Sequence, residues 1–275
     1  MPKSSTIAFL LIPLLLLPSL LQSGVVAAQP GASSTTGLIV PLYGQVGQEW
    51  ERLIQAKEAH PSVPVVAIVN AASGSGDARN PAYASAIDSL KAAGIVVVGY
   101  VSTREGGRPI KSLETDIAEW RSWYGVDGVY FDQMPQRSGM EGYYAYMTQF
   151  AKSHGMTVTM GNPGANTSLS YIGTVGTIVI SEGVGVPSLS YLAGWDKGGN
   201  GKENFAFIAR SVPGYNSTYL VDAAASVGFL FISDVSDYFA LPTYLSSEMS
   251  SLQWLASGPH VPLNALVPPR MLVPR

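Results

Sequence analysis

Short apolar runs rich in β-branched residues alternate with amphipathic segments along most of the chain. Eight runs have the length and composition of buried strands. They cover residues 37–43, 64–70, 95–102, 126–132, 156–162, 177–182, 205–211 and 227–234. Segments of helix length with helical periodicity lie between and after them, at 49–59, 83–93, 113–123, 141–154 and 244–255.

Eight strand-and-helix units predict an α/β fold, a single (β/α)8 barrel of the TIM type. Near-continuous apolar strands separated by helices are typical of a parallel sheet covered by helices, and eight units close a barrel. An open doubly wound sheet is the alternative. That fold usually has a glycine-rich phosphate-binding turn after the first strand, which Gly44-Gln45 does not resemble. Asn80 before Pro81 also predicts a capped helix start.

The two ends of the chain differ in character from the expected barrel at 37–256. Residues 1–28 combine Lys3, an apolar stretch and small residues at 26–28, which is the pattern of a secretory signal peptide. An uncleaved anchor is the alternative. A spacer of small polar residues follows at 29–36, and a proline-rich extended tail occupies 257–275. We therefore expect a secreted, extracellular or cell-surface protein without a membrane span in the mature chain.

Composition excludes several kinds of chemistry. The 275 residues have a net charge of −3 and no basic run, which argues against nucleic acid as a partner. The absence of cysteine excludes thiol catalysis and thiolate metal sites. His60, His154 and His260 fall at predicted helix ends or in the tail, which argues against Ser-His-Asp hydrolysis and histidine-ligated zinc. We expect no metal, no cofactor and a monomer.

Carboxylates at the ends of predicted strands remain as candidates for catalysis. Reactive groups of such a barrel lie at the carboxyl ends of its strands. Asp132 ends the fourth strand and Glu182 the sixth, so both can belong to one layer, and regular alternation along each strand lets them point inward. Two facing acids are the usual machinery of glycosidases. The alternative is that Asp132 caps a helix and Glu182 pairs with an arginine.

Other polar and aromatic residues near the predicted mouth are candidates for binding substrate. Aromatic faces stack on sugar rings, and polar side chains hydrogen-bond to hydroxyl groups. The candidates are Tyr43, Asn70, Tyr100, Arg104, Tyr130, Gln133, Asn162, Trp195 and Asp234. Core packing is the alternative for the aromatic residues, an ion pair with Glu105 is the alternative for Arg104, and a helix cap is the alternative for Asp234.

Several segments, in order along the chain, resemble the spherulin-4 family. They are GLIVPLY at 37–43, VPVVAIVN at 63–70, Gly99-Tyr100 with Thr103-Arg104, and WYGVDGVYFD at 123–132. The resemblance spans residues 37 to about 255 and implies a secreted or surface-displayed barrel. It also implies endo-acting hydrolysis of polysaccharide rich in galactosamine or N-acetylgalactosamine, with Asp132 and Glu182 as the acids. The family has Asp-Glu where this chain has Asp132-Gln133, and an amide cannot exchange a proton as a catalytic acid or base.

Three hypotheses for function follow. The first is an extracellular glycosidase with Glu182 as general acid and Asp132 as nucleophile, or as base in an inverting mechanism; the sequence leaves the stereochemical outcome open. The second is a surface carbohydrate-binding protein on an inactive barrel, because of Gln133. The third is a structural envelope protein that binds no glycan. Release of reducing ends from galactosamine-containing polymer distinguishes the first two.

Overall fold

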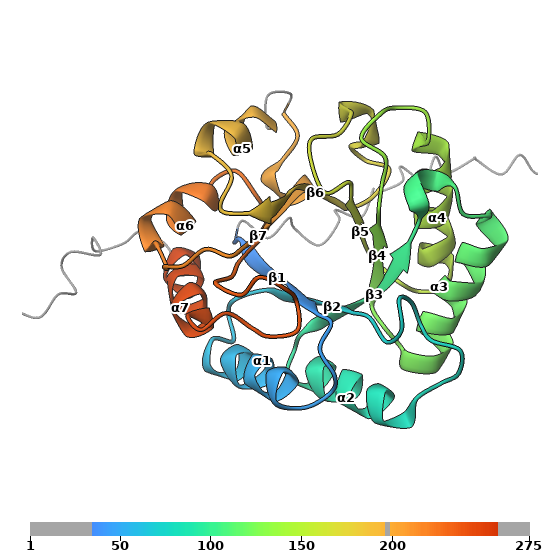
Figure 1. Ribbon diagram of the computed structural model, residues 1–275, viewed down its shortest axis with the longest axis horizontal. Coiled ribbons are helices and arrows are strands. Elements are labelled where there is room, and N and C mark those ends of the chain that lie inside the picture. The colour runs from blue at the N-terminus through green and yellow to red at the C-terminus, as the bar shows by residue number, and fades with distance from the viewer. Residues whose placement is uncertain (1–34, 196–198, 258–275) are drawn as a thin grey trace, which may run out of the picture. The chain divides into compact units, whose positions relative to one another are not determined.

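Eight parallel strands pair edge to edge, in chain order, into a closed barrel in which β8 pairs with β1. The computed structural model describes residues 35–195 and 199–257 (Figure 1). The strands are β1 (Gly37–Leu42), β2 (Val65–Val69), β3 (Val96–Ser102), β4 (Gly128–Asp132), β5 (Val158–Asn162), β6 (Thr177–Val184), β7 (Phe205–Arg210) and β8 (Phe229–Ile232). The predicted (β/α)8 barrel is confirmed.

Helices form a ring around the strands, as Figure 1 shows. In the described ranges they are α1 (Gln48–Ala59), α2 (Pro81–Ala92), α3 (Ile110–Tyr124), α4 (Glu141–Ser153), α5 (Leu189–Trp195), α6 (Ser217–Ala223) and α7 (Leu245–Ala256). The expectation of a helix in every unit is wrong after β5, where a short 3-10 helix, Leu169–Tyr171, stands instead. Pro163 and two glycines with positive φ, Gly164 and Gly173, break up that segment.

The strands are buried on both sides because the barrel interior covers one face and the helices cover the other. Every residue of β1 and β2 is buried. Gly99 of β3 lets a helix side chain pack directly on the strand: a Cβ there would lie 2.4 Å from the Trp120 ring of α3. The Trp120 indole also donates to the Tyr100 carbonyl at 2.9 Å. This contact fixes α3 against the strand that carries Tyr100.

The predicted start of α2 is confirmed. The Asn80 side chain accepts hydrogen bonds from the backbone N–H groups of Ala82 and Tyr83, and Pro81 is the first helical residue. These bonds satisfy donors that the first turn of a helix leaves free.

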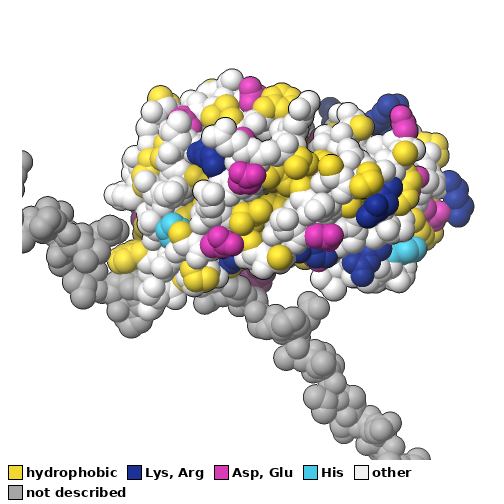
Figure 2. Space-filling view, turned by 90° about the horizontal axis from the view of Figure 1, so that it is seen from below, with side chains coloured by type: hydrophobic (Ala, Val, Ile, Leu, Met, Phe, Trp, Pro, Cys, Tyr) yellow, Lys and Arg dark blue, Asp and Glu magenta, His cyan; other side chains and the backbone are white. Residues whose placement is uncertain are grey.

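The predicted signal peptide, most of the spacer and nearly all of the tail lie outside the described residues. The last spacer residue, Thr36, is buried, and its hydroxyl lies 2.8 Å from the carbonyls of Ala224 and Val227. No helix in the described part of the chain has the length and apolar character to cross a membrane. Acidic and basic side chains both occur on the face shown in Figure 2.

Candidate active site

Asp132 and Glu182 meet around one amide group at the carboxyl ends of the strands. Asp132 ends β4, Glu182 lies on β6, and Asn162 ends β5 between them. The Asn162 Nδ2 donates to Asp132 Oδ1 at 2.9 Å and also to Glu182 Oε2. Asn162 is 4% exposed, and its Oδ1 accepts from the Gly164 N–H at 2.8 Å. A buried amide, held by its own turn, therefore sets the relative position of the two acids.

Two tyrosines hold the remaining carboxyl oxygens. The Tyr100 hydroxyl donates to Asp132 Oδ2 at 2.7 Å, and the Tyr238 hydroxyl donates to Glu182 Oε1. Tyr43 packs edge-to-face between them, its ring centroid 5.8 Å from that of Tyr100 and 5.5 Å from that of Tyr238. All four carboxyl oxygens thus accept a hydrogen bond, and both side chains are held in one orientation.

The phenols around the acids remain protonated. Burial raises the pKa of each phenol, and the negative charge of Glu182 raises it further. The charge of Asp132 adds to this at all of them except Tyr238. The four residues are Tyr43, Tyr100, Tyr130 and Tyr238. Tyr130 is 1% exposed, so it belongs to the core below the acids and does not face the opening.

A β-bulge in β6 affects the orientation of Glu182. The pairing of β6 with β7 shifts by one residue between Val179 and Ser181. The carbonyl of the intervening residue, Ile180, accepts from the Tyr191 hydroxyl of α5 at 2.5 Å. The regular alternation expected for this strand is therefore interrupted two residues before Glu182.

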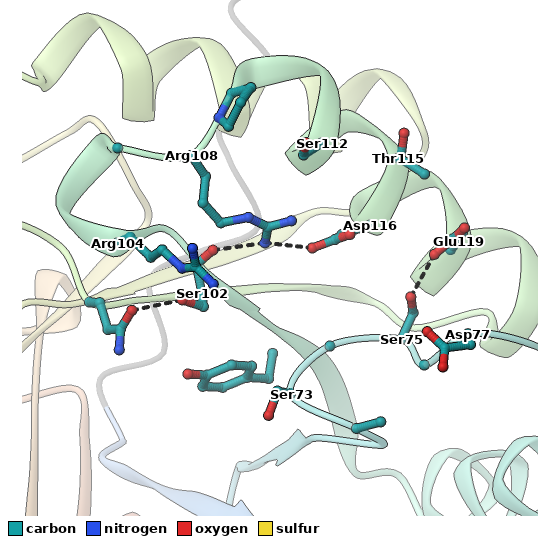
Figure 3. Close-up of a pocket in the computed structure, with 17 residues that line it drawn as sticks. Ser73, Ser75, Asp77, Ser102, Arg104, Arg108, Ser112, Thr115, Asp116 and Glu119 are labelled. Atoms are coloured by element: carbon teal, nitrogen blue, oxygen red, sulfur yellow. Dashed lines mark hydrogen bonds and ion pairs between the residues drawn. The ribbon is translucent and has the colours of Figure 1, made fainter.

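Two cavities open beside the acids. The acid cavity, of about 250 Å³, is lined by both carboxylates together with Glu105, Gln133 and Asn162. The large cavity, of about 870 Å³, lies between the loop at 72–77, the loop at 102–109 and α3 (Figure 3). Tyr100 and Gln133 line the large cavity and adjoin Asp132, so the two cavities are neighbours.

Three residues at the junction of the cavities have left-handed backbone angles, which are unfavourable for side chains with a Cβ. They are Arg104 (φ 49°), Glu105 (φ 55°) and Gln133 (φ 57°). Gln133 Oε1 accepts from the Ser102 hydroxyl at 2.7 Å, and its carbonyl accepts from the Glu105 N–H at 2.8 Å. Such strain is concentrated at functional sites. The alternative ion pair between Arg104 and Glu105 is absent from the ion pairs of the described residues.

Three other predicted residues are engaged elsewhere. The Asn70 side chain accepts from the Gly74 N–H at 3.0 Å and so holds the loop beside the large cavity. Asp234 accepts from the backbone and hydroxyl of Thr243, which fixes the chain before α7. Trp195 does not lie at the mouth, contrary to expectation. It is 6% exposed and packs against Phe205, at the amino end of β7.

Tyr238 and Glu105 are site residues that sequence reasoning missed. Tyr238 lies in a loop and Glu105 in a single 3-10 turn, Arg104–Gly106, so neither helical nor strand periodicity marks either position. Each is placed by contacts distant in the sequence. The one available signal for Tyr238 is its place in an aromatic pair with Phe239 shortly after the eighth strand. Within the described ranges, no group of three histidine or acidic side chains is arranged to hold a metal ion.

Comparisons with known proteins agree on one family and one fold. The model of spherulation-specific family 4 matches residues 37–252. Spherulin-4 of Physarum polycephalum is 29% identical over 242 residues, covering 82% of this chain and 72% of that protein.

Two solved structures resemble the barrel. The crystal structure of Aspergillus clavatus Sph3 in complex with GalNAc has a TM-score of 0.74 and 21% identity, covering 80% of this chain and 98% of that one. The YdjI aldolase of Escherichia coli K12 has a TM-score of 0.50 and 10% identity, covering 81% and 89%. At these identities the likeness shows the fold.

Proposed function

We propose that this chain, which belongs to spherulation-specific family 4, is a secreted or cell-surface glycoside hydrolase acting on galactosamine- or N-acetylgalactosamine-containing polysaccharide. The main support is the pair of carboxylates, Asp132 and Glu182, that Asn162 bridges at the mouth of the barrel. The complex of Sph3 with GalNAc supports the sugar class, and the predicted signal peptide supports export. The acids and the residues that hold them come from one chain, which supports a monomer.

The shared amide favours a retaining mechanism. Two acceptors on one amide nitrogen, each at hydrogen-bond distance, lie about 5 Å apart because the two N–H bonds diverge by about 120°. Carboxyl groups in retaining glycosidases are about 5–5.5 Å apart, whereas those of inverting enzymes are separated further to admit a water molecule.

Each acid then has a defined part. Glu182 donates its proton to the glycosidic oxygen as the bond to the anomeric carbon breaks, and the Asp132 carboxylate bonds to that carbon. Glu182, now ionised, takes a proton from water, whose oxygen displaces Asp132 and releases the sugar. Asn162 and Tyr100 hold Asp132 for attack, while Tyr238 steadies Glu182.

Depolymerisation of galactosamine- and N-acetylgalactosamine-containing polymers tests this proposal. The wild type should release reducing ends, with retained anomeric configuration when products are followed by NMR. Asp132→Asn and Glu182→Gln should each lower the rate by at least about 1,000-fold, as loss of a catalytic group does. Asp88→Asn, on the exposed side of α2, is the matched control and should retain the wild-type rate. Equal activity in all four proteins would refute the site.

Gln133 favours a second candidate function, a carbohydrate-binding protein that does not cleave. Its side chain lines both cavities but can neither donate nor accept a catalytic proton. On this reading the wild type binds the polymer without releasing reducing ends, and Gln133→Glu gains hydrolysis. The Ser102 hydroxyl can donate to a carboxylate at this position as it does to the amide, so the variant is suited to the existing site.

A further inference from the structure

The large cavity is too big and too polar to be a packing gap in the barrel. Its volume of about 870 Å³ is more than three times that of the acid cavity and lies in the range of small-molecule sites. It is walled by two loops at the carboxyl ends of β2 and β3, which is the side of such a barrel where ligands bind. Its position next to Asp132 makes it continuous with the proposed reaction site.

Charged side chains face one another across this cavity. Figure 3 shows Arg104 and Arg108 on the loop after β3, with Asp116 and Glu119 on α3. The Arg108 guanidinium donates to Asp116 at 2.7 Å and to the Ser102 carbonyl at 2.9 Å, so this pair braces the wall. Glu119 accepts from the Ser75 hydroxyl through one oxygen, at 2.7 Å. These bonds hold the charged side chains of the lining in fixed positions.

Other groups in the lining are available to a ligand. Among the described residues, the Arg104 guanidinium and the second oxygen of Glu119 have no hydrogen-bond or ion-pair partner. The Gln133 amide nitrogen is also uncommitted, because only its oxygen is bonded. The cavity therefore offers free donors and a free acceptor. A sugar hydroxyl is both donor and acceptor, so a hydroxyl-rich ligand matches this set.

The strained turn at Arg104 and Glu105 connects this cavity with the acids. The Arg104 side chain lines the large cavity, and that of the next residue, Glu105, lines the acid cavity. The Glu105 N–H bonds to the Gln133 carbonyl, and the Thr103 hydroxyl lies 2.9 Å from the same carbonyl. These bonds hold a left-handed turn. Because of this turn, the adjacent charged side chains of Arg104 and Glu105 lie in different cavities. Backbone strain kept in this way indicates a functional constraint.

We propose that the large cavity is a subsite for the sugar units that continue the glycan on one side of the bond at Asp132 and Glu182. Arg104, Glu119 and Gln133 are its contacts, with Gln133 at the crossing between the two cavities. The proposal rests on the proposed function and adds to it the place where the chain extends. It also gives Gln133 a role, because its amide N–H can donate to substrate without exchanging a proton.

Binding measured in the Asp132→Asn background tests the subsite without turnover. The probes are a disaccharide and a hexasaccharide of N-acetylgalactosamine, titrated by calorimetry. The hexasaccharide should bind about ten-fold or more tighter than the disaccharide, since only the longer chain fills the large cavity. Adding Arg104→Ala or Glu119→Gln should reduce this ratio to near one. Glu58→Gln, an exposed glutamate on α1 outside both cavities, should leave the ratio as it was.

The outcomes separate the two proposals. If the ratio of hexasaccharide to disaccharide affinity is unchanged in both Arg104→Ala and Glu119→Gln, the subsite proposal is overturned, while hydrolysis at the acid pair stands. If neither oligosaccharide binds and the wild type releases no reducing ends, the proposed function fails and the subsite fails with it.

Discussion

At the scale of single residues, one amide joins the two acids. Asn162 is the only described side chain that hydrogen-bonds to both Asp132 and Glu182, and it is buried and tied to the Gly164 N–H. In the proposed mechanism Asn162 is a positioning residue, since it holds the acids without exchanging a proton itself.

Asn162→Ala should therefore lower kcat by about 100-fold, the cost of letting reacting groups move by roughly an ångström. The loss should fall on kcat more than on KM, because Asn162 holds the two acids in position. Urea denaturation of the variant checks that the fold is retained. Asn166→Ala, an exposed position in the following loop, is the matched control. A kcat equal to that of the wild type would remove Asn162 from the mechanism.

Single residues also show where prediction from sequence ends. Asp132 and Glu182 can be selected because a charge that follows an apolar strand is conspicuous and the fold brings strand ends together. Asn70 and Asp234 stand at equivalent strand ends, but local partners, Gly74 and Thr243, occupy their side chains. No sequence pattern predicts such hydrogen bonds within loops. The same limit hides Tyr238, whose partner is 56 positions away.

At the scale of elements, β6 depends on its neighbour α5. The bulge at Ile180 interrupts the pairing of β6 with β7, and the Tyr191 hydroxyl donates to the Ile180 carbonyl. Ile180 is fully buried, so a carbonyl left without a donor there is costly. The helix therefore stabilises the irregular strand that presents Glu182.

Tyr191→Phe should destabilise the fold by about 1–3 kcal/mol, the cost of leaving a buried acceptor unsatisfied. It should also reduce kcat, because Glu182 follows the bulge by two residues. Urea denaturation and steady-state kinetics measure the two effects. Tyr146, an exposed residue of α4, donates its hydroxyl to Glu114 of α3. Tyr146→Phe removes this hydroxyl and should change stability by less than about 0.5 kcal/mol. Equal midpoints for the two variants would contradict this role for Tyr191.

The apolar runs predict all eight strands because both faces of a parallel barrel strand are buried. The helix after β5 is predicted wrongly because the number of units was taken from the strands, whereas glycine and proline decide that segment. The bulge in β6 is invisible for a different reason. A run of apolar residues has the same sequence pattern whether or not one of its residues is unpaired in a bulge.

At the scale of the whole molecule, stability rests on core packing, because the chain has no cysteine to form a disulfide. Among the described residues, one carboxyl group is nevertheless fully enclosed in this core. Glu248 of α7 is 0% exposed, and neither carboxyl oxygen makes a hydrogen bond of good geometry in the described chain. Burial raises its pKa well above the usual range, the Ile232 backbone opposes this slightly, and the Asp234 charge adds to it. The phenols of Tyr215 and Tyr244 also lie nearby.

Folding therefore holds the Glu248 proton more tightly than the unfolded chain, which loses it near pH 4.3. Binding of this proton contributes to the free energy of unfolding fully below that pH. Above it, the contribution decreases by about 1.4 kcal/mol per pH unit until the folded carboxyl ionises. Glu248→Gln keeps the shape without the titration, so it should be more stable than the wild type at pH 7 and match it near pH 4. Urea denaturation across this range measures the difference, with exposed Glu58→Gln as control. Parallel stability curves for wild type and Glu248→Gln would show that the buried carboxyl does not set the pH dependence.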